Sequence, residues 1–116
     1  MSEPAQFPVR ESAYDIALAN PEAFRSGFLA WLADNYHVWT AFEREANRIW
    51  KRGRRHYSAR TIGEVLRHES ALAENGGEWK LNNVIFPDLA RLYLLVNPER
   101  DGFFELRVQA KSERAA

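Results

Sequence analysis

The chain has 116 residues, the size of one ordinary domain, and its sixteen basic residues balance its sixteen acidic ones. It has no cysteine, which excludes disulfides, thiolate metal ligands and thiol nucleophiles. No apolar run approaches the roughly 20 residues that span a bilayer, and residues 1–12 lack the basic flank and apolar run of a secretory signal. We therefore expect a soluble cytoplasmic protein.

The N-terminal third predicts an arm followed by one helix. Residues 1–12 hold two prolines and no apolar periodicity, which predicts a flexible arm. In ANPEAFRSGFLAWLADN, residues 19–35, Asn20 can cap a helix and Pro21 suits its first turn. The apolar residues that follow have helical spacing, so we expect one helix that ends before Asn35.

Two longer helices are predicted in the middle of the chain. Apolar residues recur on one face of residues 36–52, and Gly53 is expected to end that helix. After a short extended segment, a second helix is expected over residues 59–73, capped by Ser58 or by a capping box from Thr61. Gly63 inside this helix costs about 1 kcal/mol relative to alanine, which suggests a site of close packing.

The C-terminal part predicts a helix and a hairpin. A turn follows residue 73, and residues 79–82 are expected to form a short strand. A helix is expected over residues 86–97, with Pro87 in its first turn. A turn at Asp101-Gly102 then leads into a strand up to residue 108, in which successive side chains face opposite ways. Residues 109–116 are expected to be a frayed tail.

The order of these elements predicts a single domain over residues 13–108, mainly α with a small β-hairpin (α+β). The last three helices and the hairpin of residues 98–108 fit a winged helix-turn-helix preceded by an extra N-terminal helix. The connection of residues 74–85 is longer than the three or four residues of a compact helix-turn-helix. A small α+β domain of no named type is therefore the alternative.

Four stretches carry a resemblance to a known family. HYSARTIGEVLRHESAL, WKLNN, PDLARLYL and GFFELR occur in this order within residues 36–108. Together they resemble a family of small, largely uncharacterised proteins from phages and prophages. The resemblance implies a winged-helix-like domain and a phage or mobile-element context, so the expected cytoplasm is that of a host cell. It supplies no catalytic residue.

Basic residues gather in one part of this neutral chain. Between Glu45 and Glu64 there is no acidic residue, and the interval holds six of the sixteen basic ones. Such a run attracts phosphates, and arginine can bind them in a bidentate manner. The candidate phosphate-binding residues are Lys51, Arg52, Arg54, Arg55, His56, Tyr57, Ser58 and Arg60. The alternative is a solvated helix end whose arginines pair with Glu43, Glu45 or the acidic arm.

The helix of residues 86–97 offers few candidates for reading bases. Asn83 could pair with adenine and Arg91 with guanine, and both are secondary candidates for nucleic-acid binding. The sequence PDLARLYLLV is mostly apolar, which favours a core helix with Asn83 in a turn. We therefore expect DNA contacts to go mainly to the backbone.

No catalytic motif, cofactor loop or metal-binding spacing of the three histidines is present in the sequence, so an enzyme is not expected. The first hypothesis is a DNA-binding phage or prophage regulator or accessory factor, for example in transcription regulation, that could act as a homodimer. The alternative is a phage-encoded, anti-CRISPR-like inhibitor that binds a host defence protein. Residues 1–45, with three basic and seven acidic residues, favour this alternative.

Overall fold

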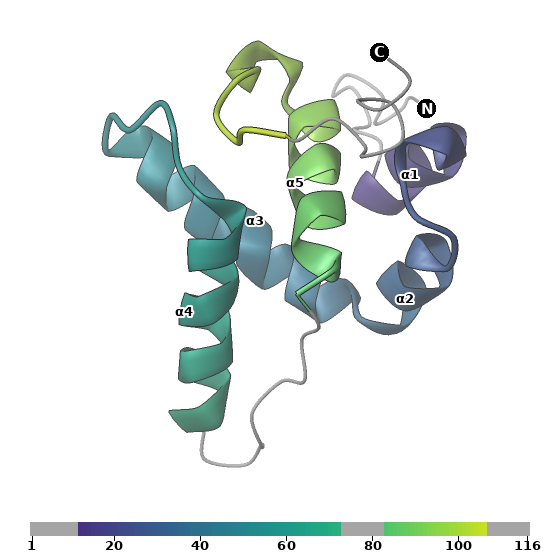
Figure 1. Cartoon of the computed structure of the whole chain (residues 1–116), viewed down its shortest axis with the longest axis horizontal. Helices are drawn as coiled ribbons and strands as arrows, with labels where there is room; N and C mark the ends of the chain where they lie inside the picture. Colours follow the sequence, from purple (N-terminus) through teal and green to yellow (C-terminus); the bar gives the residue numbers. More distant parts are fainter. Residues whose placement is uncertain (1–11, 73–82, 107–116) are drawn as a thin grey trace, which may run out of the picture.

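In the computed structural model, which describes residues 12–72 and 83–106, the chain forms five α-helices and two short 3-10 helices. These are α1 (Ala13–Ala19), η2 (Pro21–Ala23), α2 (Phe28–Asp34), α3 (Tyr36–Lys51), α4 (Ala59–Leu72), α5 (Ile85–Val96) and η3 (Pro98–Arg100). Helix α5 stands in the middle, in contact with α1, α3 and α4 (Figure 1). Within these residues no helix is long and apolar enough to cross a membrane.

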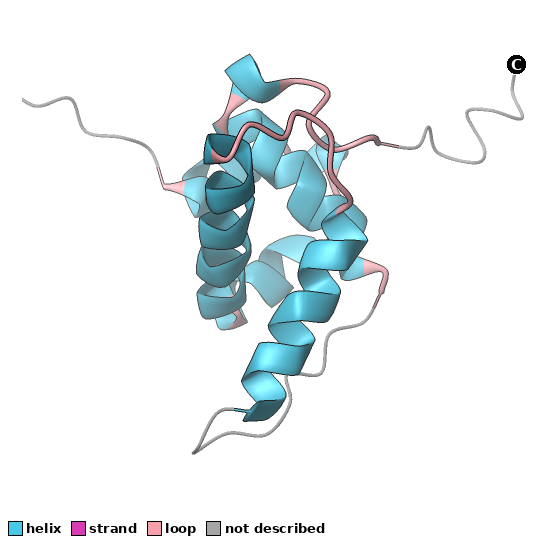
Figure 2. Ribbon diagram, turned by 90° about the vertical axis from the view of Figure 1, so that its left-hand side faces the viewer, coloured by secondary structure: helices cyan, strands magenta, loops and turns pink. Residues whose placement is uncertain are grey.

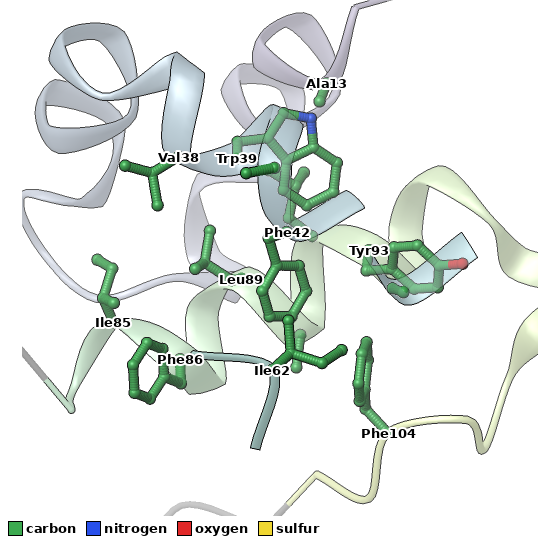
Figure 3. Packing of buried hydrophobic residues seen from close by; sticks show 14 of the residues in the cluster. Ala13, Val38, Trp39, Phe42, Ile62, Ile85, Phe86, Leu89, Tyr93 and Phe104 are labelled. Atoms are coloured by element: carbon green, nitrogen blue, oxygen red, sulfur yellow. The ribbon is translucent and has the colours of Figure 1, made fainter. Parts of the chain in front are cut away.

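One apolar core joins all five helices. Phe42 of α3 lies fully buried near Ile62 of α4 and Leu89 of α5 (Figure 3). Trp39 and Tyr93 are also fully buried and bring large aromatic area into the same cluster. Because α5 supplies buried residues on most of its circumference, it is a core helix, as its apolar sequence favours.

The predictions for the two central helices are confirmed. The predicted apolar face of α3 consisted of Val38, Trp39, Phe42, Ala46, Ile49 and Trp50. The first five are buried, and Trp50 is half-buried. The helix ends before Gly53, whose φ of +100° is costly for any residue with a Cβ. Asn35 occupies the N-terminal cap position of α3, and its side-chain amide donates to the carbonyl of Trp31 in the preceding helix.

Helix α4 begins with a cap from Ser58, whose Oγ accepts a hydrogen bond from the backbone N–H of Thr61 at 3.2 Å. The expected close packing at Gly63 is also present. A Cβ placed on this residue would lie 2.2 Å from the nearest ring atom of Phe86. Gly63 therefore lets α4 and α5 approach each other through the ring of Phe86.

The prediction of a single helix after Asn20 is wrong. The structure has a short α1 before that residue, and Asn20 closes α1 because its side-chain amide donates to the carbonyl of Ile16. Pro21 then opens η2, Phe24 is extended, and α2 begins only after Gly27. Gly27 has a φ of +92°, which no right-handed helix accommodates, so the chain is interrupted there.

The hairpin expected over residues 98–108 is also not seen. Figure 2 shows helices and loops and no strand in the described part of the chain. Residues 98–100 form η3, the turn at Gly102 is present, and Phe103 and Phe104 are then both buried instead of facing opposite ways. Phe104 makes one isolated parallel bridge with Tyr57, so this segment packs on the core and does not pair with itself. The fold is therefore all-α where it is described.

Several expectations lie outside the described residues: the N-terminal arm up to residue 11, the turn after residue 73, the strand of residues 79–82, the end of the predicted C-terminal strand at residues 107–108, and the C-terminal tail.

Candidate nucleic-acid interface

The candidate interface is the segment that joins α3 to α4, which we call the basic loop and define as residues 51–60. It lies at the end of α3 that is farthest from α2 (Figure 1). Gly53, with its positive φ, makes the turn between Arg52 and Arg54. All five cations of the loop are exposed: Lys51, Arg52, Arg54, Arg55 and Arg60.

Arg55 is the most firmly placed of these cations. Its Nη1 donates to the backbone carbonyls of Trp50 at 2.9 Å and Arg54 at 3.1 Å. Its guanidinium carbon lies 3.9 Å from the centroid of the Trp50 ring. A guanidinium so close over an indole makes a favourable cation–π contact. The side chain therefore packs against the Trp50 ring and also donates to a carbonyl at the C-terminal end of α3.

The far side of the loop is fastened to the segment after η3. The backbone N–H of Tyr57 donates to the carbonyl of Phe103 at 2.9 Å, and His56 Nδ1 lies 3.1 Å from the carbonyl oxygen of Gly102. Arg54 sits over the half-buried Tyr57 ring, with its guanidinium carbon 5.4 Å from the ring centroid. The loop is thus held at both ends although its surface is exposed.

Trp50 and Arg100 are residues that the sequence did not single out for this site. The guanidinium of Arg100 lies 5.0 Å from the centroid of the Trp50 ring, and its Nη1 donates to Asn47 Oδ1 at 2.7 Å. Phe103 meets the same indole edge-on. One feature of the sequence could have identified Trp50 as part of the site: it lies in the last turn of a helix, among cations. Arg100 had no such feature, because its contact depends on how η3 returns to α3.

The ion pairs of the described residues leave the loop cations out. Four such pairs are present: Arg48 with Glu45, Arg67 with Glu64, Arg91 with Asp88, and Arg100 with Glu99. The alternative, in which the loop arginines pair with Glu43 or Glu45, is not seen among these ion pairs, and the Glu45 carboxylate binds Arg48. The acidic arm lies outside the described residues. In the described structure, the positive charge of residues 51–60 faces solvent.

The two secondary candidates lie apart from the loop. Asn83 is exposed in the turn before α5, and its Oδ1 accepts a hydrogen bond from Arg67 at 3.4 Å. Arg91 donates to Asp88 Oδ1 at 3.2 Å. Asp88 is only 1% exposed and also accepts from the backbone N–H of Arg25 at 3.4 Å. Arg91 therefore compensates a buried carboxylate in the core.

The burial of Asp88 predicts a specific dependence of stability on pH. Burial raises the pKa of this carboxyl above its ordinary value of 3.8, against the opposing effects of Arg25 and Arg91. The folded state then binds protons more readily than the unfolded state, so this contribution to stability is present at low pH and is lost as the pH rises through the folded-state pKa.

We therefore expect the wild type to gain stability relative to Asp88→Asn as the pH falls from neutral towards about 4. Urea denaturation of both proteins at several pH values measures this difference. Asp34→Asn, which replaces an exposed carboxyl of α2, serves as the control for the loss of one aspartate. A difference between wild type and Asp88→Asn that stays constant with pH would contradict the assignment.

A hollow of about 440 Å³ opens beside the basic loop. His56 forms one side, and the segment after η3 forms most of the rest. Its lining residues are His56, Leu94, Asp101, Gly102, Phe104, Glu105 and Leu106. In the described ranges, no three His, Asp or Glu side chains lie close enough to hold a metal ion. The arrangement can attract anions at the loop and hold an apolar group in the hollow.

Comparison with protein-family models, curated proteins and solved structures found no match to the chain.

Proposed function

We propose that the chain is a non-enzymatic nucleic-acid-binding protein that contacts phosphates through the basic loop, as a phage or prophage regulator or accessory factor. The observation that carries the proposal is the exposure of five cations within ten residues, none of them in an ion pair with another described residue. Lys and Arg so arranged release condensed counterions when they meet a phosphate backbone, which favours binding.

Stabilisation of a helix end accounts for only part of this charge. Cations near the C-terminus of a helix interact favourably with its dipole. Arg55 does so directly through the carbonyl of Trp50. Arg52, Arg54 and Arg60 make no side-chain hydrogen bond to that helix end within the described structure, and Arg60 lies at the start of α4. Their number exceeds what the end of α3 requires.

Of the winged-helix interpretation, this proposal uses the three helices and not the wing. In that layout α3, α4 and α5 form the helical core, and the loop between α3 and α4 lies beside the DNA backbone. Helix α5, which would read bases, is largely buried, so it offers few polar side chains to a groove. We therefore expect phosphate contacts to provide most of the affinity.

The test is a fluorescence-anisotropy titration of labelled DNA at two salt concentrations. We expect log K to fall with log salt by about 0.9 per phosphate contacted on a duplex. Arg54→Glu should weaken binding at low salt about ten-fold, since each such charge contributes to the counterion-release term. Arg44→Glu is the matched control, because Arg44 is an exposed arginine of α3 outside the loop.

Equal losses for Arg44→Glu and Arg54→Glu would show that only the general charge of the protein matters. Absence of binding at low salt would overturn the proposal.

The alternative, a phage-encoded inhibitor of a host defence protein, has one supporting observation. The hollow beside the loop combines exposed Leu106 with the carboxylates of Asp101 and Glu105. An apolar centre with a charged rim is a common form of protein-binding surface. If the titration finds no DNA binding, this hollow becomes the surface to test against host proteins.

A further inference from the structure

We propose that the basic loop selects single-stranded nucleic acid by stacking an unpaired base on the guanidinium of Arg55. This inference rests on the proposed function and specifies its substrate class. The structural basis is the layered pair in which Arg55 covers Trp50 at 3.9 Å. Arginine planes and aromatic rings are the surfaces on which proteins stack bases that have left a helix.

Arg55 is prepared for this role before any ligand arrives. Two hydrogen bonds from Nη1 fix the head group, and the indole of Trp50 supports one face of it. The indole is in turn held by the edge-on ring of Phe103. A long side chain that is already fixed loses less conformational entropy on binding than a free one. Arg55 thus differs from Arg52, which has no such support among the described residues.

The same contacts leave Arg55 with a free face and a free edge. The residue is exposed, so the guanidinium face opposite Trp50 is open to a ligand. Its described hydrogen bonds use Nη1, which leaves the edge formed by Nε and Nη2 for a phosphate or base oxygen. A base stacked on that face would extend the layers of Trp50 and Arg55. Neighbouring loop cations would meet the phosphates on either side of it.

A duplex offers much less to this arrangement. Its bases are stacked on one another, so none is available to the face of Arg55 unless it is flipped out at a cost. Arginines that enter a minor groove must extend, whereas Arg55 is folded back onto Trp50 and its carbonyl. Helix α5 is buried and cannot serve as a reading helix in the major groove. A duplex can therefore use only the phosphate contacts.

The experiment compares labelled single-stranded DNA, single-stranded RNA and duplex DNA of one sequence in anisotropy titrations. We expect the single strands to bind at least about five-fold more tightly than the duplex. This factor corresponds to the lower end of the stacking energy of one base on an aromatic or arginine plane. Arg55→Lys keeps the positive charge and removes the planar guanidinium. It should weaken single-strand binding about five-fold, with less than about two-fold change on the duplex. Arg44→Lys, at an exposed arginine of α3 outside the basic loop, is the matched control and should change neither affinity by more than about two-fold.

Two further titrations show whether the bases, and which kind of single strand, are responsible for the affinity. Abasic sites in the single strand keep the phosphates and remove the bases, so they should reduce its affinity to the level of the duplex. The DNA and RNA strands differ in the 2′-hydroxyl and identify which single strand is preferred. A thermal melt of Arg55→Lys confirms that the variant is folded at the titration temperature.

The outcomes separate this inference from the proposed function. Duplex binding as tight as single-strand binding, or equal losses for Arg55→Lys on both, would overturn the stacking role and leave phosphate binding in place. Failure of every probe to bind at low salt would overturn both.

Discussion

Replacing Phe104 with alanine is expected to lower the free energy of unfolding by about 3–5 kcal/mol. Phe104 is 2% exposed, and its ring lies 5.5 Å from that of Phe42 and 5.4 Å from that of Tyr93, measured between centroids. It therefore joins the segment after η3 to both α3 and α5. Its removal would leave a cavity at this junction, which the surrounding helices could fill only in part.

Urea denaturation of the wild type and of Phe104→Ala measures the loss. Leu106→Ala is the matched control two residues further on. Because Leu106 is 39% exposed, its truncation should cost less than about 1 kcal/mol. Similar costs for the two variants would mean that Phe104 does not belong to the core in solution.

Replacing Gly63 with alanine is expected to lower the free energy of unfolding by about 1–3 kcal/mol, although alanine is the better helix former by about 1 kcal/mol. The new methyl group would lie 2.2–2.7 Å from three atoms of the Phe86 ring. Such an overlap requires the ring to move or α4 to shift away from α5. Overpacking therefore outweighs helix propensity at this position.

Thermal and urea unfolding measure this effect, with Thr40→Ala at an exposed position of α3 as the control. The double variant Gly63→Ala/Phe86→Leu should lose less free energy of unfolding than the two single variants lose together. The smaller leucine side chain leaves room for the new methyl group. A stabilising Gly63→Ala would show that α4 and α5 do not pack this closely.

The sequence predicted the long helices well because two independent signals agreed there. In α3 the apolar spacing identified the buried face, and Gly53 marked the end. In α5 a run of apolar residues after Pro87 predicted a core helix. Gly63 was also informative, since its cost inside a helix implied a site of close packing, and the structure shows that its neighbour there is Phe86.

The sequence failed where the same residue type can serve either end of a helix. Asn20 was expected to start a helix, but it closes α1, which has only seven residues and too few turns to show a periodic face. The hairpin failed for a different reason. Phe103 and Phe104 are adjacent, and adjacent residues of a strand face opposite sides. Their joint burial depends on the contact with Tyr57, 46 and 47 positions away, which no local pattern reveals.

For the candidate site, the charge pattern located the loop but could not rank its residues. The sequence treats Arg52, Arg54 and Arg55 alike, whereas in the structure only Arg55 among these three lies on Trp50. Ser58 proved to be a helix cap and Arg91 the partner of a buried carboxylate. Such roles depend on three-dimensional neighbours and not on composition.

The parallel bridge between Tyr57 and Phe104 also has a consequence for the order of events during synthesis. The turn after α3 is synthesised first, and the groups that fasten it, Gly102 and Phe103, are made about fifty residues later. At typical elongation rates of about 5–20 residues per second, the loop spends several seconds without this support. A nascent chain would therefore expose this positive charge for some seconds before the contacts that hold the loop can form.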